Sequence, residues 1–286
     1  MIKYLFICFM CLSFYSKGQY IDVGASIGGT TYQGDISHYS SRISFQGARF
    51  LKSIHFGYHL SESVALKLKY TKTSISAYDK DSKDVWRAAR NLHFVTDIKD
   101  VSLLAEIELL DMFKKLRKFN LKPFVYFGIT YFNFNPKASY NGRWYDLQPL
   151  STEGQGLPGH KAPYSLHQIG IPFGFGLSYF IRPDVYISFE IGPRITFTDY
   201  LDDVSEDYPD FELLRQFKGP IAADISYRTD ELPEGPPENA LKTEARGNDR
   251  DNDWYFFNSF TVGYKLNVVD YKKRRRSFRH GRKCHF

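Results

Sequence analysis

Three observations in the sequence predict an all-β fold, an eight-stranded antiparallel up-and-down barrel that spans an outer membrane. Apolar and polar residues alternate with period 2 in eight segments, each near the roughly 9 to 11 residues that a tilted strand needs to cross a bilayer. Short and long connections alternate between these segments. No stretch reaches the ~18 consecutive apolar residues of a membrane-spanning helix, whereas alternating strands fit the mean hydropathy of −0.39.

The first residues have the pattern of a secretory signal peptide. Lys3 precedes an apolar core over 4–15, and a cut after Gly18 follows a small residue. We therefore predict a signal peptide over 1–18, an outer-membrane barrel with long external loops over 19–270, and a basic periplasmic tail over 271–286. Cys8 and Cys11 would leave with the signal, so Cys284 would be the one cysteine of the mature chain.

The first four predicted strands have apolar residues on one face. In the third, Leu66, Leu68 and Tyr70 alternate with Lys67 and Lys69, which does not fit a helix face. The four segments are 20–29, 53–60, 64–71 and 101–109.

The last four predicted strands are richer in aromatic residues and glycine. In the sixth, Ile171, Phe173 and Phe175 point one way, and Gly174 and Gly176 point the other. The four segments are 123–134, 169–179, 184–198 and 253–268.

The connections predict the orientation of the barrel. Outer-membrane barrels have brief periplasmic turns and long external loops. We therefore expect both termini in the periplasm, short or moderate turns at 61–63, 112–120 and 182–184, and external loops at 30–43, 74–99, 135–164 and 199–252.

A soluble lipocalin-type barrel is the structural alternative, because it also has eight strands with one polar and one apolar face, but with the faces reversed. Aromatic residues that flank the predicted strands favour the membrane barrel, where they would form girdles at the two interfaces. These residues are Tyr20, Tyr70, Phe134, Tyr164, Tyr179, Tyr200 and Trp254.

With the apolar faces outward, a set of charged residues faces the lumen. Side chains fill the interior of so small a barrel, and charges there must be paired. Because Lys67 and Lys69 lie on the strand next to Glu106 and Glu108, we predict cross-strand ion pairs in a structural plug. A proton or ion relay is the alternative. The proposed lumen network is Lys67, Lys69, Glu106, Glu108, Glu190 and Arg194, with Asp22, His55, His59 and Lys265 on the same face.

An acidic cluster, Asp199, Asp202 and Asp203, lies in the longest predicted loop. Carboxylates at this density suit a hard cation such as calcium, but their spacing is not that of a known calcium loop. Salt bridges, with Arg246 as a partner, and solvated surface are the alternatives. We predict neither a metal nor a cofactor here.

Catalysis at the external rim is the second class of function considered. His38, His93, His160 and His167 lie near predicted rims, where an aspartate of the acidic cluster could complete a general-base arrangement. No spacing makes this specific, so we predict that the chain is not an enzyme. An outer-membrane barrel enzyme that acts on lipid or peptide stays an alternative.

The C-terminal tail carries the basic character of the chain. The net charge is +6, and eight cations fall within the last 15 residues. In the periplasm such a run would meet an acidic partner protein, a polyanion or anionic lipid, so we predict no nucleic-acid partner. Cys284 could form an intermolecular disulfide, and a solvated tail with an inert thiol is the alternative. The predicted partner-binding residues are Lys272, Lys273, Arg274, Arg275, Arg276, Arg279, Arg282, Lys283 and Cys284.

Several segments together resemble the PorG family, the outer-membrane barrels of the type IX protein secretion system, which is also linked to gliding motility. Segments 152–156 and 198–205 carry the two specific motifs, Glu-Gly-Gln-Gly at 153–156 and Asp-Tyr-Leu-Asp-Asp-Val-Ser at 199–205. The glycine-aromatic strand patterns are shared by many OmpA-like barrels. The other segments that carry the resemblance are 32–35, 90–91, 135–138, 147–150, 171–174, 190–194 and 246–248.

The resemblance implies a non-enzymatic structural component that associates with the periplasmic ring of PorK-like and PorN-like proteins and helps to attach it to the outer membrane. It therefore implies protein–protein interaction in protein secretion and gliding, with outer-membrane lipid around the barrel. A small structural OmpA-like barrel without a secretion role is the alternative. The resemblance does not assign the basic run of the tail or Cys284.

Overall fold

The structure, a computed structural model, describes residues 20–36, 47–109, 120–233 and 245–266. The predicted signal peptide and tail lie outside these ranges. The strands are β1 (Tyr20–Gln33), β2 (Arg49–His59), β3 (Val64–Tyr78), β4 (His93–Glu108), β5 (Leu121–Tyr140), β6 (Arg143–Asp146), β7 (His167–Phe180), β8 (Val185–Thr196) and β9 (Trp254–Leu266). The helices are α2 (Val85–Arg90), α4 (Phe211–Lys218) and α5 (Pro220–Ser226), with 3-10 turns η2 (Asp79–Asp81), η3 (Gln148–Leu150) and η4 (Thr229–Glu231).

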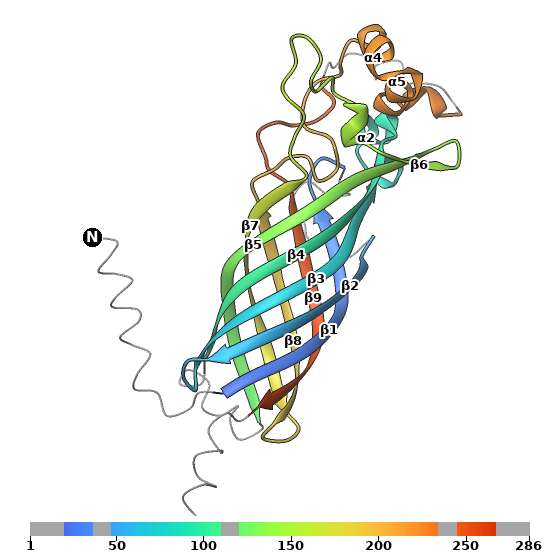
Figure 1. Cartoon of the computed structure of the whole chain (residues 1–286). Helices are drawn as coiled ribbons and strands as arrows, with labels where there is room; N and C mark the ends of the chain where they lie inside the picture. Colours follow the sequence, from blue (N-terminus) through green and yellow to red (C-terminus); the bar gives the residue numbers. More distant parts are fainter. Residues whose placement is uncertain (1–19, 37–46, 110–119, 234–244, 267–286) are drawn as a thin grey trace, which may run out of the picture.

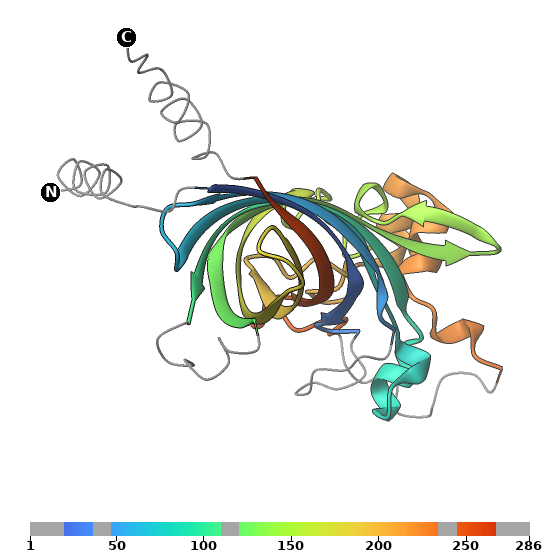
Figure 2. The ribbon, with the colours of Figure 1, turned by 90° about the horizontal axis from the view of Figure 1, so that it is seen from below.

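Eight of the strands form a closed antiparallel barrel, which confirms the predicted fold class. The pairing runs β4-β3-β2-β1-β9-β8-β7-β5, and β4 pairs with β5 to close the ring (Figures 1 and 2). The remaining strand, β6, pairs only with the end of β5 and forms a hairpin that projects beside the barrel. β1 begins and β9 ends at one end of the barrel, the turn end, and the opposite end is the loop end.

The outer wall of the barrel is apolar. Every second residue of β7 is exposed, as the predicted alternation requires, and Phe175 and Ile129 are each 65% exposed. A soluble lipocalin-type barrel would turn its apolar face inward, so this wall contradicts that alternative and fits contact with lipid. No helix in the described ranges is long and apolar enough to cross a membrane.

Two predicted loops are shorter than expected because the strands on either side continue beyond the apolar belt. β3 and β4 stay paired as far as Tyr78 and His93, and β5 runs to Tyr140. The continuation of β3 contains Lys72, Ser74 and Ser76, which break the outward apolar pattern. The extensions are held by backbone pairing and by inward side chains such as Ile75 and Phe94, which are buried beneath the loops, so the outward apolar alternation did not predict them.

The predicted aromatic girdles are only partly present. Tyr70 and Tyr179 are exposed on the outer wall. Phe134, Tyr164 and Tyr200 instead form a stack inside the loop end, with ring centroids 6.2 and 4.4 Å apart. Phe134 is a core residue on the inward face of β5, and the half-buried Tyr164 packs against this core. Tyr200 is also half-buried and stacks on Tyr164, so none of the three rings lies in an outer girdle.

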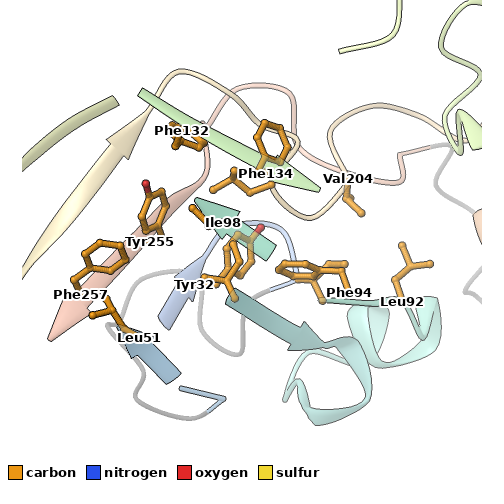
Figure 3. Close-up of a cluster of buried hydrophobic side chains, with 13 residues drawn as sticks. Tyr32, Leu51, Leu92, Phe94, Ile98, Phe132, Phe134, Val204, Tyr255 and Phe257 are labelled. Atoms are coloured by element: carbon orange, nitrogen blue, oxygen red, sulfur yellow. The ribbon is translucent and has the colours of Figure 1, made fainter. Parts of the chain in front are cut away.

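The loops and helices at the loop end form a folded cap, called the head below. The largest buried apolar cluster lies where the head meets the strands, and Figure 3 shows its rings converging from several strands. Phe94, Phe132 and Tyr255 come from three strands, while Leu201 and Val204 come from the loop after β8. This shared core fixes the head on the barrel.

Candidate functional site

The lumen near the turn end contains a buried carboxylate with three partners. Asp22 lies 3.0 Å from His55 Nε2 and 2.9 Å from His59 Nε2, and it accepts a hydrogen bond from the Tyr186 hydroxyl. Tyr20 stacks on the His59 ring, with centroids 3.8 Å apart, so it faces the lumen and not the predicted girdle.

Two lysines of β3 form ion pairs within the lumen. Lys67 Nζ lies 2.7 Å from Glu106 Oε2 on the neighbouring β4, as the strand order predicts. Lys69 does not pair with β4, where its opposite residue is Ser102. It reaches across the barrel to Glu190 on β8.

The rest of the predicted lumen network is also paired, with one correction. Glu108 accepts from Lys122 on β5 at 2.7 Å and does not pair with either lysine of β3, because it lies beyond them towards the turn end. Arg194 is fully buried, and its Nε lies 3.7 Å from Asp100 Oδ2, an ion pair too long for a hydrogen bond. Its guanidinium lies 4.4 Å from the Phe257 ring centroid. Paired charges and aromatic rings thus occupy the lumen from the turn end to the head.

Several of the loop segments that resemble the PorG family meet in one buried network in the head. Arg246 Nη1 donates to Glu153 Oε1 at 2.8 Å and to the backbone oxygen of Asp203 at 2.5 Å. The same Glu153 oxygen accepts from Ser205 N at 2.9 Å, and Asp203 accepts from the Thr152 hydroxyl. Arg246 Nη2 also lies 3.8 Å from Asp203 Oδ2, so the salt bridge to Arg246, one of the alternatives considered above, is present for one aspartate of the acidic cluster.

A second arginine joins three further segments of the head. Arg90 donates to both carboxylate oxygens of Asp79, at 2.7 and 2.9 Å, to the backbone oxygen of Asp35 at 3.0 Å, and to that of Arg246. The Asp35 side chain in turn accepts from Asn248 N at 2.7 Å. These bonds fix the loop after β1 against α2 and the segment before β9.

The remaining aspartates of the acidic cluster are buried with a third carboxylate, Asp253. The Tyr32 hydroxyl lies 2.6 Å from Asp202 and 2.7 Å from Asp253, but it has one proton to donate, so one carboxyl must itself be protonated. Burial raises the pKa of Asp202 to about 8 and that of Asp199 to about 9.

The calcium alternative does not fit this geometry. Asp202 and Asp203 point to different hydrogen-bond partners, and no group of three or more potential ligands that could hold a metal occurs in the described ranges. The acidic cluster is thus part of the interior of the head.

The rim histidines do not form a general-base pair with the acidic cluster in the part of the chain that the structure describes. His93 Nδ1 lies 3.0 Å from Arg228 Nη1. His167 Nδ1 lies 3.0 Å from a tyrosine hydroxyl on the outer surface. The His160 ring covers Gly154, and His38 lies outside the described residues.

The residues predicted to bind a partner through the tail also lie outside the described ranges. They are Lys272, Lys273, Arg274, Arg275, Arg276, Arg279, Arg282, Lys283 and Cys284. Their role stays a prediction.

Sequence reasoning missed two adjoining clefts in the head. The first has a volume of about 430 Å³ and aromatic residues in its wall, among them Trp86, Tyr208, Phe211 and Tyr227. The second has a volume of about 540 Å³ and is lined by polar residues, including Gln33, Arg250 and Asn252, together with Phe197 and Trp254. Both clefts share Asp35, Arg87 and Asn248. Their residues come from separate loops, so no local pattern indicated them.

Comparisons with known proteins find one matching family and a set of solved structures with a similar fold. Residues 2–224 match the family described as Domain of unknown function (DUF6089). No curated protein matches at a significant level.

Solved structures with a similar arrangement share little sequence with this chain. Neisserial surface protein A is 11% identical with a TM-score of 0.42, over 87% of this chain and 100% of that one. A major outer membrane protein from Thermus thermophilus is 12% identical with the same score and coverage. The N-terminal β-barrel domain of Pseudomonas aeruginosa OprF is 13% identical with a TM-score of 0.35, over 86% and 97%. At identities and TM-scores this low, these structures indicate nothing about the function of this chain. The barrel is established by the strand pairing described above.

Proposed function

We propose, from the premise that this chain belongs to the DUF6089 family, that it is a non-catalytic outer-membrane anchor whose binding surfaces lie at the two ends of the barrel. The apolar outer wall supports residence in a lipid bilayer. The short turns and both ends of the described barrel lie together, which supports an orientation with the termini in the periplasm and the head outside.

The observation that carries the proposal is the paired and buried lumen. The Lys69 and Glu190 side chains are 4% and 12% exposed, and Arg194 is completely buried. Removing one member of such a pair leaves an uncompensated buried charge, so the lumen resists opening. The barrel therefore suits a fixed support better than a pore.

The resemblance set out above supports a more specific role. We propose that the chain is the outer-membrane component of a type IX secretion system and helps to attach a periplasmic ring of PorK-like and PorN-like proteins. The head contacts of Glu153, Asp203 and Arg246 give the loop motifs a structural role, so these motifs need not touch the ring. The ring contact is then left to the turn end and to the tail over 271–286.

Co-purification from membranes solubilised in mild detergent tests this role. We expect the ring lipoprotein to co-purify with the full chain and to be lost when residues 271–286 are deleted. A Trp144→Ala variant, changed at the exposed β6 hairpin, is the control and should retain the ring. Recovery of the barrel alone under the same conditions would contradict the anchor and favour a small structural barrel.

A non-reducing gel of the same membranes tests the proposed disulfide. We expect a higher band with the full chain that disappears in Cys284→Ser. The absence of such a band would show that Cys284 is an inert thiol, and the tail would then act through its charge alone.

A further inference from the structure

We propose that the two adjoining clefts of the head form one binding site for a neutral oligosaccharide. The first cleft opens between α2 and the segments around Tyr208 and Tyr227, and the second lies against the ends of β1, β8 and β9. Because Asp35, Arg87 and Asn248 line both, a chain of several sugar rings could lie across the shared wall. The site goes beyond the proposed secretion role and does not depend on it.

The first cleft offers aromatic faces to a ligand. Trp86, 50% exposed, stands on α2 at one side. On the other side, Tyr208 packs against Phe211 and Tyr227 with ring centroids 6.0 and 5.7 Å away, so the three rings hold one another in place. A pyranose ring has an apolar face of C–H groups, which packs against an aromatic ring and forms weak contacts with its π-electrons.

The second cleft adds planar polar groups and a second tryptophan. Gln33 and Asn252 each present one amide with donors and an acceptor. Such groups form paired hydrogen bonds with the neighbouring hydroxyls of a sugar. The Asn248 amide already donates to Asp251 Oδ2 at 2.9 Å and accepts from Arg250 N at 3.3 Å, so it holds the wall of the cleft in place. Trp254 lines the same cleft, so both clefts combine an indole ring with polar groups, as small-molecule sites generally do.

The charges around the clefts favour a neutral ligand over an anion. Arg90 and Arg246, which line the first cleft, already donate to Asp79 and to Glu153. Asp35, Asp84 and Asp251 also line the clefts, together with Arg87 and Arg250, so the rest of the lining has no excess of positive charge for a phosphate or carboxylate. A neutral hydroxylated ligand needs no such excess.

The shared wall is rigid before any ligand binds. Asp35 is fixed by Asn248 N at 2.7 Å and by Arg90 at its backbone oxygen. Gly247 lies so close that a Cβ there would be 2.8 Å from Asp35 Oδ2 and 2.6 Å from Ser205 N. A site held in this way loses little conformational freedom on binding, which favours affinity.

A peptide is the other extended ligand to consider. Peptides that dock on β-proteins commonly add a strand to a free edge and bind through backbone groups. The wall that the two clefts share is instead lined by Asp35, Arg87 and Asn248, which come from three separate segments and form no strand edge. The chemistry therefore favours sugar hydroxyls.

The test begins with the detergent-purified full chain on a printed array of neutral oligosaccharides, acidic oligosaccharides and short peptides. We expect binding to neutral oligosaccharides. Titration of the best-bound neutral oligosaccharide should then show affinity lowered by about tenfold or more in Trp86→Ala and in Asn252→Ala, which corresponds to about 1.4 kcal/mol. Trp144→Ala is the matched control, because Trp144 is 56% exposed on the same head but lines neither cleft.

Tryptophan fluorescence gives a second readout. The chain has three tryptophans, of which Trp86 and Trp254 line the clefts and Trp144 does not. We expect the fluorescence change on oligosaccharide binding to persist in Trp144→Phe and to shrink in Trp86→Phe. A protease digest of each variant verifies that its head is folded.

Three results would overturn the site. The first is an array without neutral oligosaccharide binding. The second is an equal loss of affinity in the Trp86 and Trp144 variants. The third is binding of peptides, but not of neutral oligosaccharides, that depends on Trp86.

Discussion

Arg246 Nη1 donates to Glu153 Oε1 over 2.8 Å, although the two residues lie 93 positions apart in the sequence. Their side chains are 2% and 0% exposed. The bond joins the loop between β6 and β7 to the segment before β9, and Asp203 of the loop after β8 completes the contact. One guanidinium thus connects three segments of the head.

Replacing Arg246 by alanine should unfold the head while the barrel stays closed. The change leaves Glu153 buried without its cation, at a cost of about 3–5 kcal/mol. Hydrogen exchange should increase over residues 197–233 and stay slow in β3 and β4, where the barrel ladder is intact.

Arg215→Ala is the control for this prediction. Arg215 pairs with Glu212, whose side chain is 85% exposed, and such a surface pair contributes about 0–1 kcal/mol. Equal exchange in the two variants would mean that the Arg246 pair does not hold the head together.

The head should lose stability as the pH rises. Burial raises the pKa of Asp202 to about 8, and unfolding would return it towards 3.8. Between these values the folded head binds more protons than the unfolded chain, so the free energy of unfolding falls with increasing pH. The contribution is complete below about pH 4 and lost above about pH 8. Hydrogen exchange of residues 197–205 across this range measures it.

Asp253→Asn should flatten this pH dependence. The new amide can donate to the Tyr32 oxygen and still accept from Leu201 N, which now donates to Asp253 at 2.8 Å. Tyr32 can then donate to Asp202 without a shared proton. Asp249→Asn, at an exposed carboxylate of the same segment, should keep the slope. If the pH dependence of stability is unchanged in Asp253→Asn, then Tyr32, Asp202 and Asp253 share no extra proton.

The lumen pair of Lys69 and Glu190 should respond differently to single and double substitution. Lys69→Met removes the ion-pair partner of the buried Glu190, which keeps a hydrogen bond from the Ser259 hydroxyl at 3.0 Å, and should cost about 3–5 kcal/mol. Lys69→Met with Glu190→Leu removes both charges and should recover most of that stability. Urea unfolding in lipid vesicles measures both, and a double variant as unstable as the single one would contradict the pairing.

How much the sequence predicts depends on what each residue faces. The eight strands were predictable because lipid outside and a polar lumen inside impose period 2, as in Leu66 to Tyr70. Beyond the belt that constraint ends, so the continuation of β3 to Tyr78 carried no signal. The head depends on contacts such as Glu153 with Arg246, which leave no periodic pattern. An acidic run such as 199–203 has the same local appearance whether it is solvated, binds a cation or is buried.

A matched pair of arginine substitutions tests whether lipid surrounds the apolar outer wall of the barrel and water surrounds the head. Phe175, near the middle of β7, and Phe217, on α4, are 65% and 54% exposed, so neither change creates a cavity. Phe175→Arg places a charge against hydrocarbon and should cost about 2–4 kcal/mol in lipid vesicles. Phe217→Arg stays in water and should change the free energy of unfolding by about 0.5 kcal/mol or less. Equal effects of the two changes would contradict a bilayer around β7, because exposure to water alone does not distinguish the two phenylalanines.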